Sequence, residues 1–186
     1  MSENQTGRSM IEMIGVLAII GVLSVGGIHG YTSVMEKYRT NRMQDEMQQL
    51  VMGVRASLDV KKIKTETDSS FWYDAGIFND DNYDKATGHG RNMFDGDIDI
   101  KTYSGAAGRT MFSVSYTNVP VYACRKIILL DWDAGSSAGG LISIDVGNRT
   151  FSWTAVSEDS RLPLTLERAL DICGSQAKVI TWHFRQ

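Results

Sequence analysis

The sequence is poor in proline, cysteine and histidine, with 2, 2 and 3 of these residues among 186. Two cysteines are too few for a four-thiolate zinc site or for a small domain built on disulfides. Neither sign of charge dominates, because 19 Lys and Arg stand against 22 Asp and Glu, for a formal net charge of -3. Broad nucleic-acid binding needs clustered positive charge, so this balance argues against it. With 42% hydrophobic residues, the chain can form one packed core.

The longest uncharged apolar segment, Met13 to Ile28, lies close to the N-terminus. A membrane-spanning helix needs roughly 20 apolar residues, and extension to Met10 supplies this length while including Glu12. Three interpretations compete: a cleaved secretory signal, a buried helix of a soluble protein, and a signal-anchor helix that stays attached. A secretory signal would begin with basic residues, but residues 1–7 contain no Lys or Arg. The sequence after Ile28 continues in a helical pattern, so we favour the signal anchor.

The helical pattern continues from Tyr31 to Leu58, where there is no Pro and Gly53 is the only Gly. Apolar residues recur at steps of three and four and form one stripe. The stripe consists of Tyr31, Met35, Tyr38, Met47, Leu50, Val51, Val54 and Leu58. Charged residues, among them Glu46 and Arg55, are expected on the other faces. We therefore predict one helix from about Ser9 to about Leu58, roughly 75 Å long.

Such a helix is too long for a domain of this size to enclose. Its N-terminal half is apolar on all sides, whereas its C-terminal half is amphipathic. The first half must therefore be buried by lipid or by other subunits, and the second by the globular part of the same chain.

The rest of the chain, Lys61 to Gln186, alternates between short strand-like segments and Gly-rich turns, after a polar, turn-rich stretch at 65–92. The strand-like segments are 97–100, 111–116, the short apolar run Ile127–Leu130, 141–146, 150–155 and 178–184. Thr165 is the expected N-cap of a short helix that ends near Cys173. Short strands with few helices predict an α+β head, in which an antiparallel sheet packs on the long helix.

The two cysteines, Cys124 and Cys173, both fall in this head. A signal-anchored head lies outside the cytoplasm, where disulfides persist. A bond closing a loop of about 50 residues would stabilise the fold by about 4 kcal/mol in the chain-entropy model. The alternatives are two buried free thiols or a nucleophilic thiol, although neither a Cys-x-x-Cys pair nor an adjacent His supports the latter. We expect the disulfide.

Other candidate sites are weak. Asp80-x-Asn82-x-Asp84 begins like a calcium loop, but Lys85 stands where Gly is needed and Arg91 where the bidentate Glu belongs. His183 is expected to be an ordinary strand residue, far in the sequence from His29 and His89. The tryptophans are expected to serve packing; they are Trp72, Trp132, Trp153 and Trp182. We find no catalytic constellation, metal site or cofactor motif.

The N-terminus carries the clearest motif. Gly7-Arg8-Ser9-Met10-Ile11-Glu12, followed at once by the apolar run, resembles the cleavage site and mature N-terminus of type IV pilins. Looser head motifs follow in the order found in type IVb pilins, especially the major pilins of conjugative thin pili and the toxin-coregulated pilin. They are NMFDG at 92–96, VP followed by Cys124, PLT at 163–165 before Cys173, and TWHF at 181–184. The chain departs from the family pattern in having Arg8 where an apolar residue is usual, no basic residue in the leader, and no Pro before Pro120.

The resemblance implies how the precursor is processed. Residues 1–7 would be a leader peptide, which a membrane prepilin peptidase removes between Gly7 and Arg8. The same enzyme would N-methylate Arg8. Glu12 stands at the fifth position of the mature chain, where the family has its characteristic glutamate.

Glu12 is the residue that the resemblance assigns to assembly. A carboxylate inside the bilayer costs roughly 2.5–3.5 kcal/mol on insertion scales, so it needs a partner. The new α-amine of Arg8 on a neighbouring subunit is such a partner, and the pair would set the axial register between apolar helices. The alternative is that Glu12 lies at the membrane edge without a role.

The resemblance also implies the domain organisation. The helix would cover residues 8–60, with 8–30 in the membrane or filament core and 31–60 packed on a head formed by 61–186. This is the α+β "lollipop" of pilins, in which the apolar half of the helix protrudes and the other half packs on an antiparallel sheet.

The implied function is structural, not enzymatic, and requires no cofactor. Such a subunit binds copies of itself in a helical homopolymer and also meets the prepilin peptidase, the assembly platform and its ATPase; no nucleic-acid partner is expected for the head. It lies in the inner membrane with a periplasmic head before assembly, and in an extracellular pilus afterwards. One alternative is a minor pilin or a type II secretion pseudopilin, and another is a signal-anchored periplasmic protein of other function. Conjugation, adhesion, aggregation and secretion all remain open as roles of the pilus.

Overall fold

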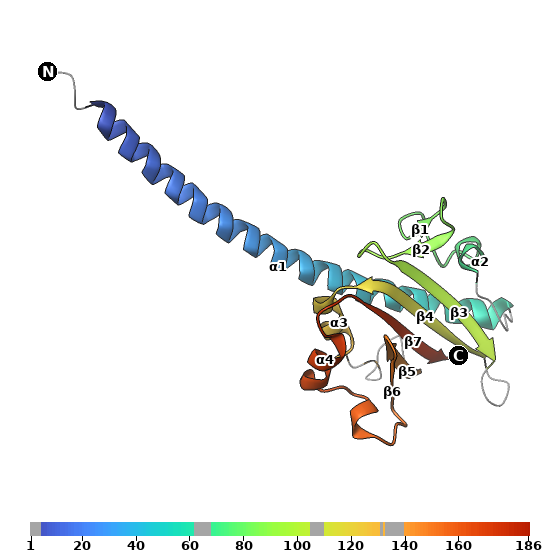
Figure 1. Cartoon of the computed structure of the whole chain (residues 1–186). Helices are drawn as coiled ribbons and strands as arrows, with labels where there is room; N and C mark the ends of the chain where they lie inside the picture. Colours follow the sequence, from blue (N-terminus) through green and yellow to red (C-terminus); the bar gives the residue numbers. More distant parts are fainter. Residues whose placement is uncertain (1–4, 62–67, 105–109, 131, 133–139) are drawn as a thin grey trace. The chain divides into compact units, whose positions relative to one another are not determined.

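The computed structural model describes residues 5–61, 68–104, 110–130, 132 and 140–186, and side chains in the first helix from residue 10 to residue 58 (Figure 1). The chain forms two compact units, Met1–Tyr38 and Arg39–Gln186, which we call unit 1 and unit 2. Each unit is described by itself below.

One helix, α1, runs from Gln5 to Lys61. It begins four residues before the predicted start at Ser9 and ends three residues after Leu58, and its continuity confirms the single long helix expected from the sequence. No proline interrupts this segment, and its apolar stripe gives the C-terminal half a surface to bury.

A seven-stranded sheet forms the centre of unit 2, in the order β1-β2-β3-β4-β7-β5-β6, and every neighbouring pair of strands is antiparallel. The strands are β1 (Tyr83–Asp84), β2 (His89–Arg91), β3 (Asp97–Ser104), β4 (Thr110–Val119), β5 (Leu141–Val146), β6 (Arg149–Ser152) and β7 (Lys178–Arg185). The last strand in the sequence, β7, is inserted between β4 and β5. The long N-terminal apolar helix and this sheet confirm the α+β pilin-like fold.

The described residues of unit 2 also form the short helical segments α2 (Ser69–Asp74), α3 (Val121–Ile127), the 3-10 helix η2 (Glu158–Ser160) and α4 (Leu166–Cys173). The predicted helix before Cys173 is confirmed as α4, and the Thr165 side chain accepts a hydrogen bond from the backbone N–H of Arg168 at 3.4 Å. The interpretation of Ile127–Leu130 as a strand is wrong. Pro120 starts α3 at its N-cap, so this apolar run begins at the end of a helix and buries Ile127 and Ile128.

The segment expected only to be polar and turn-rich, residues 65–92, contains α2, β1 and β2. The two strands are short and pair through Tyr83 with Gly90 and Asp84 with His89. A strand of two or three residues is too short to show a detectable alternation of apolar and polar residues, so the sequence pattern did not predict β1 and β2.

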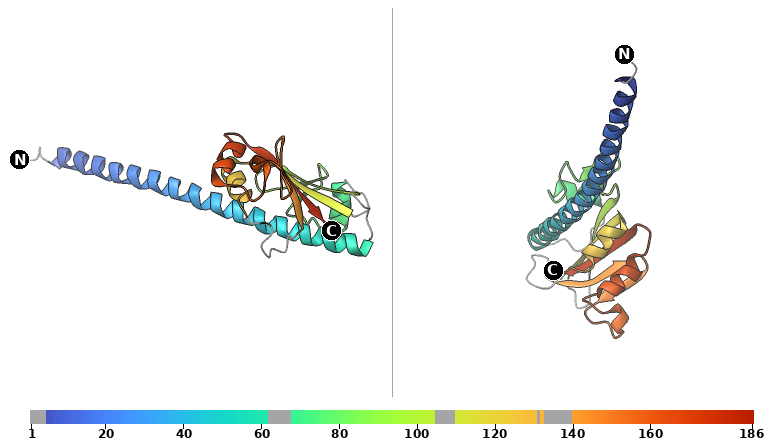
Figure 2. Two further views of the ribbon diagram at one scale, coloured as in Figure 1. Left: turned by 90° about the horizontal axis from the view of Figure 1, so that it is seen from below. Right: turned by 90° about the vertical axis from the view of Figure 1, so that its left-hand side faces the viewer.

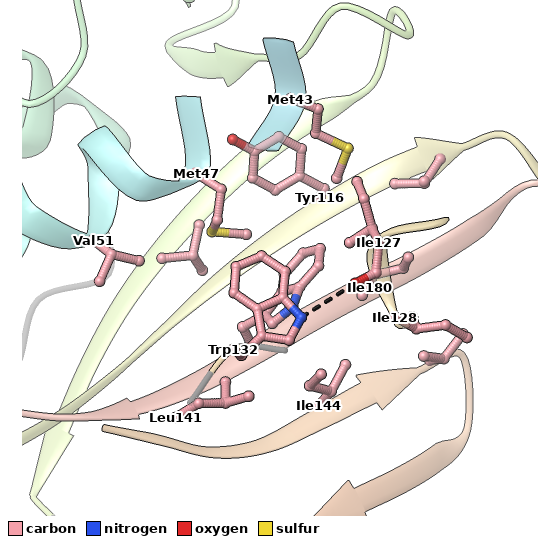
Figure 3. Close-up of a cluster of buried hydrophobic side chains, with 14 of the residues drawn as sticks. Met43, Met47, Val51, Tyr116, Ile127, Ile128, Trp132, Leu141, Ile144 and Ile180 are labelled. Carbon is pink, nitrogen blue, oxygen red and sulfur yellow. Dashed lines mark hydrogen bonds between the residues drawn. The ribbon is translucent and has the colours of Figure 1, made fainter. Parts of the chain in front are cut away.

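The part of α1 that belongs to unit 2 runs along one face of the sheet (Figures 1 and 2). Its buried side chains belong to the same core cluster as those of β3, β4 and β7. Figure 3 shows Met43, Met47 and Val51 of α1 directed toward Tyr116 and Trp132. The indole N–H of Trp132 donates to the backbone carbonyl of Ile127 at 3.2 Å. The core is therefore closed by α1 from Met43 to Leu58, which confirms the later part of the predicted stripe, whereas Tyr31 and Tyr38 at its start are exposed.

Candidate functional site

Unit 1 exposes the apolar part of α1. Large hydrophobic side chains from Met10 to Val34 are each at least 53% exposed. They are Met10, Ile11, Met13, Ile14, Val16, Leu17, Ile19, Ile20, Val22, Leu23, Val25, Ile28, Tyr31 and Val34. The helix is long and apolar enough here to cross a membrane, so it is a candidate membrane anchor.

The expected processing and assembly residues lie at the start of this helix. Gly7 and Arg8 have helical backbone, but their side chains and residues 1–4 lie outside the described residues. Glu12 is exposed on the apolar segment. Cleavage after Gly7, methylation of Arg8 and the assembly role of Glu12 stay predictions.

The expected disulfide is present. Cys124 in α3 and Cys173 in α4 are bonded, with their Cα atoms 5.9 Å apart, and both are fully buried. A hydrogen bond also joins the neighbouring residues, because the guanidinium of Arg125 donates to the carbonyl oxygen of Gly174 at 3.2 Å. The bond joins the helix after β4 to the helix before β7. It therefore connects the segment that follows β4 to the segment that leads into β7.

A polar cleft of about 450 Å³ lies in unit 2 between α1 and the segments around β2. It is lined by Arg42, Asp45, Glu46, Gln49, Asn79, Asp81, Asn82, Arg91, Asn92, Met93 and Asp95. The Glu46 carboxylate accepts from Asn82 Nδ2 at 3.2 Å and from Tyr116 Oη at 3.3 Å. Burial raises the pKa of Glu46, while these two hydrogen bonds act against the rise.

Glu46 and Arg55 lie off the apolar stripe of α1, as expected, but they are not fully exposed. Both flank the buried stripe and are half-buried. The Arg55 guanidinium lies 5.9 Å from the ring centroid of Phe112 and 5.8 Å from that of Phe184, and burial lowers the pKa of Arg55. Positions beside an apolar stripe are covered when a sheet packs on the helix, which the helical pattern alone does not reveal.

His183 is more than an ordinary strand residue. Its Nδ1 lies 2.9 Å from Tyr103 Oη and its Nε2 lies 2.8 Å from Asp145 Oδ2, so side chains of β3, β7 and β5 form one hydrogen-bonded chain. An ionised Asp145 only accepts, so a neutral His183 donates from Nε2 and accepts the Tyr103 hydroxyl at Nδ1. Burial, and then the charge of Asp145, raise the pKa of Tyr103. The three residues lie far apart in the sequence, which gave no signal of this arrangement.

The carboxylates of the calcium-like segment are engaged by cations of the chain itself. Lys85 Nζ lies 2.8 Å from Asp80, and Arg91 lies 3.2 Å from Asp84. The hydrogen bond from Lys85 is the largest cause of the lowered pKa of Asp80. Among the residues that the structure describes, no group of three or more His, Cys, Asp or Glu side chains is placed to hold a metal ion.

Comparison with known proteins adds one finding. The family model described as PilS N terminal matches residues 31–184, which include the amphipathic half of α1 and nearly all of the head. No curated protein matches the chain significantly.

Proposed function

This chain belongs to the PilS family, which is related to the type IV pilins, and from this membership we propose that it is the major subunit of a type IVb pilus. A type IV pilin-like subunit has a structural role, and its two parts serve it differently. The apolar helix of unit 1 would hold the subunit in a membrane and later in a filament, while the disulfide-bonded unit 2 would form the filament surface.

The observation that carries this proposal is the exposed apolar surface of α1. Burying one Val, Leu, Ile or Met side chain stabilises by about 1.5–3 kcal/mol, and residues 10–34 leave a whole series of them exposed. A membrane and a bundle of like helices both bury such a surface on every side. A subunit that is stored in a bilayer and then transferred into a helical filament uses both environments in turn.

Processing would prepare the subunit for this transfer. The peptidase would cut between Gly7 and Arg8, leaving Arg8 as an N-methylated terminus and removing the leader of residues 1–7. The support is the motif Gly7 to Glu12 directly before the apolar run. Gly7 has no side chain to obstruct approach of the peptidase to the backbone.

Assembly would then depend on Glu12 of one subunit and the α-amine of Arg8 on the next. A carboxylate among apolar helices is unfavourable until a cation lies beside it. Because the α-amine of Arg8 appears only after cleavage, uncut precursor would lack the group that fixes the register. The membrane stage would place unit 2 in the periplasm, where the disulfide between Cys124 and Cys173 can form.

Shear-released filaments test the proposal. The expected result is abundant filaments whose subunit mass begins at Arg8 and includes one methyl group. Short, scarce filaments with the same mature terminus would favour a minor pilin or pseudopilin. A retained Met1, or a cut after Ser24 or Gly27, would contradict processing and favour a signal-anchored protein of other function.

A further inference from the structure

The polar cleft between α1 and the segments around β2 has a volume of about 450 Å³, which is within the range of pockets that hold small molecules. All of its lining residues belong to unit 2. Side chains from three separate segments meet there: α1, the loop before β1, and β2 with the turn that follows it. A ligand in the cleft would therefore be held by three parts of the chain at once.

Hydrogen bonds within the chain fix the walls of the cleft. The Glu46 carboxylate of α1 accepts from Asn82 Nδ2 at 3.2 Å, which ties the loop before β1 to the helix. In the same loop, the side-chain oxygen of Asn79 accepts from the backbone N–H of Asp81 at 2.9 Å. The amide of Asn92 donates to a backbone carbonyl of β4 at 2.8 Å. Because these walls are formed without a ligand, binding would cost little further ordering of the protein.

Five lining residues keep their side-chain polar groups available, and we call them the free lining residues. They are all exposed, and among the residues that the structure describes none of them makes a side-chain hydrogen bond or ion pair. They are Arg42, Asp45, Gln49, Asp81 and Asp95. Guanidinium groups only donate, ionised carboxylates only accept, and the Gln amide does both. The cleft therefore offers a ligand both kinds of hydrogen-bonding partner.

Charges of both signs in the cleft disfavour a strongly charged ligand. An anion would be repelled by the carboxylates of Asp45, Asp81 and Asp95. A cation would be repelled by the guanidinium groups of Arg42 and Arg91. An uncharged ligand with many hydroxyl groups avoids both repulsions, and each hydroxyl both donates and accepts a hydrogen bond.

A second hollow, of about 440 Å³, adjoins the cleft, because Asp81 and Arg91 line both. Tyr83 also lines this hollow, and its half-buried ring stacks on that of Tyr73 with the ring centroids 4.4 Å apart. The cleft itself contains one half-buried apolar side chain, that of Met93. Polar groups for hydroxyls and apolar surface for C–H groups therefore lie side by side, over a length that suits more than one sugar ring.

We propose that this cleft binds a neutral saccharide, with the ring hydroxyls of the sugar on the free lining residues. The carboxylates would accept from hydroxyl groups in charge-assisted hydrogen bonds, and Arg42 and Gln49 would donate to hydroxyl oxygens. Binding would need only the folded unit 2, so this activity goes beyond the proposed structural role. In the proposed filament every subunit would carry the cleft, and individually weak contacts with a glycan-covered surface would add through avidity.

Saturation-transfer NMR measures this binding, because it reports the ligand protons that contact the protein. The full chain is kept in lauryldimethylamine oxide micelles, whose headgroup contains no sugar, and empty micelles give the background. The neutral probes are lactose, maltose, mannobiose and chitobiose, whereas digalacturonate and free lysine are the anionic and cationic probes. We expect transfer to at least one neutral disaccharide, and stronger transfer to it than to either charged probe.

Two matched double variants locate the site. Asp45→Ala with Gln49→Ala removes one carboxylate and one amide from the α1 wall, where alanine is favourable for the helix. The dissociation constant should rise at least about tenfold, because hydrogen bonds that include one to a charged group are lost. Asp74→Ala with Gln176→Ala removes an exposed carboxylate and an exposed amide outside the cleft, and should leave the dissociation constant unchanged.

Asp81→Ala changes a second wall of the cleft and should also weaken binding. Urea unfolding followed by tryptophan fluorescence verifies that each variant is folded. Absence of transfer to every neutral disaccharide, or equal weakening by the two double variants, would overturn the saccharide site. Transfer to lysine alone or to digalacturonate alone would overturn it as well and would identify a charged ligand instead.

Discussion

The side-chain amide of Asn92 donates to the backbone carbonyl of Thr117 at 2.8 Å and so joins the loop before β3 to the end of β4. The Asn92 carbonyl oxygen accepts from the backbone N–H groups of Phe94 at 2.8 Å and Gly96 at 3.1 Å. Asn92 is only 5% exposed, and an added Cβ at Gly96 would clash with Thr117. The NMFDG motif therefore serves close packing between two strands.

Asn92→Ala should lower the free energy of unfolding of the head by at least about 2 kcal/mol. The change leaves buried N–H and C=O groups without partners, and each such group costs about 1–3 kcal/mol. Urea unfolding followed by tryptophan fluorescence provides the measurement. Gln176→Ala, at an exposed position, is the matched control and should change the free energy by less than about 0.5 kcal/mol. Equal effects of the two variants would show that the Asn92 network contributes nothing.

Glu46→Gln should make the free energy of unfolding of the head less dependent on pH. Burial raises the pKa of Glu46, so the folded state binds its proton more tightly than the unfolded state, whose value is near 4.5. In the parent, the contribution of Glu46 to the free energy of unfolding is therefore fully present below about pH 4.5. That contribution is lost as pH rises through the higher pKa of the folded state.

Gln keeps the partners Asn82 and Tyr116 without carrying a charge. We expect the variant to match the parent at low pH and to exceed its stability at neutral pH, as measured by unfolding between pH 4 and pH 8. Asp45→Asn, at the exposed neighbouring position, is the control. A variant less stable than the parent at neutral pH would mean that the ionised carboxylate is favourable in the fold.

Cys173→Ser should destabilise the head by about 4 kcal/mol, because the bond to Cys124 closes a loop of 49 residues. This is a large part of the 5–15 kcal/mol typical of a domain. Thermal unfolding without reductant, with a Cys124→Ser and Cys173→Ser double variant for comparison, measures the loss. Reductant should lower the stability of the parent and leave the double variant unchanged. Normal filament yield from Cys173→Ser would argue that the bond is dispensable.

Glu12→Gln should allow cleavage between Gly7 and Arg8 but reduce filament yield severely. The substitution keeps the size of the side chain and removes the charge that pairs with the α-amine of a neighbour. Arg8→Phe, which removes the second cation beside that amine, should assemble at least as well as the parent. Intact mass reports cleavage, and sheared protein per cell reports assembly. Normal assembly of Glu12→Gln would rule out charge pairing as the source of register.

Local sequence pattern determined much of this protein. The apolar run and the stripe from Tyr31 to Leu58 specify α1 because a helix repeats every 3.6 residues over many turns. Thr165 specifies the start of α4 for an equally local reason, since its side chain caps a backbone N–H three residues away. The pilin-like N-terminal motif also lies within consecutive residues, and the family match covers the later part of the chain, residues 31–184.

Tertiary structure alone decided the features that depend on distant partners. The insertion of β7 between β4 and β5 brings Tyr103, His183 and Asp145 together, although no short-range pattern connects them. Packing of the sheet on α1 makes Glu46, expected only to lie off the apolar stripe, a half-buried carboxylate with a raised pKa. Ile127–Leu130 shows the same limit, because a short apolar run fits a strand or a buried helix end equally well, and the chain around it determines which forms.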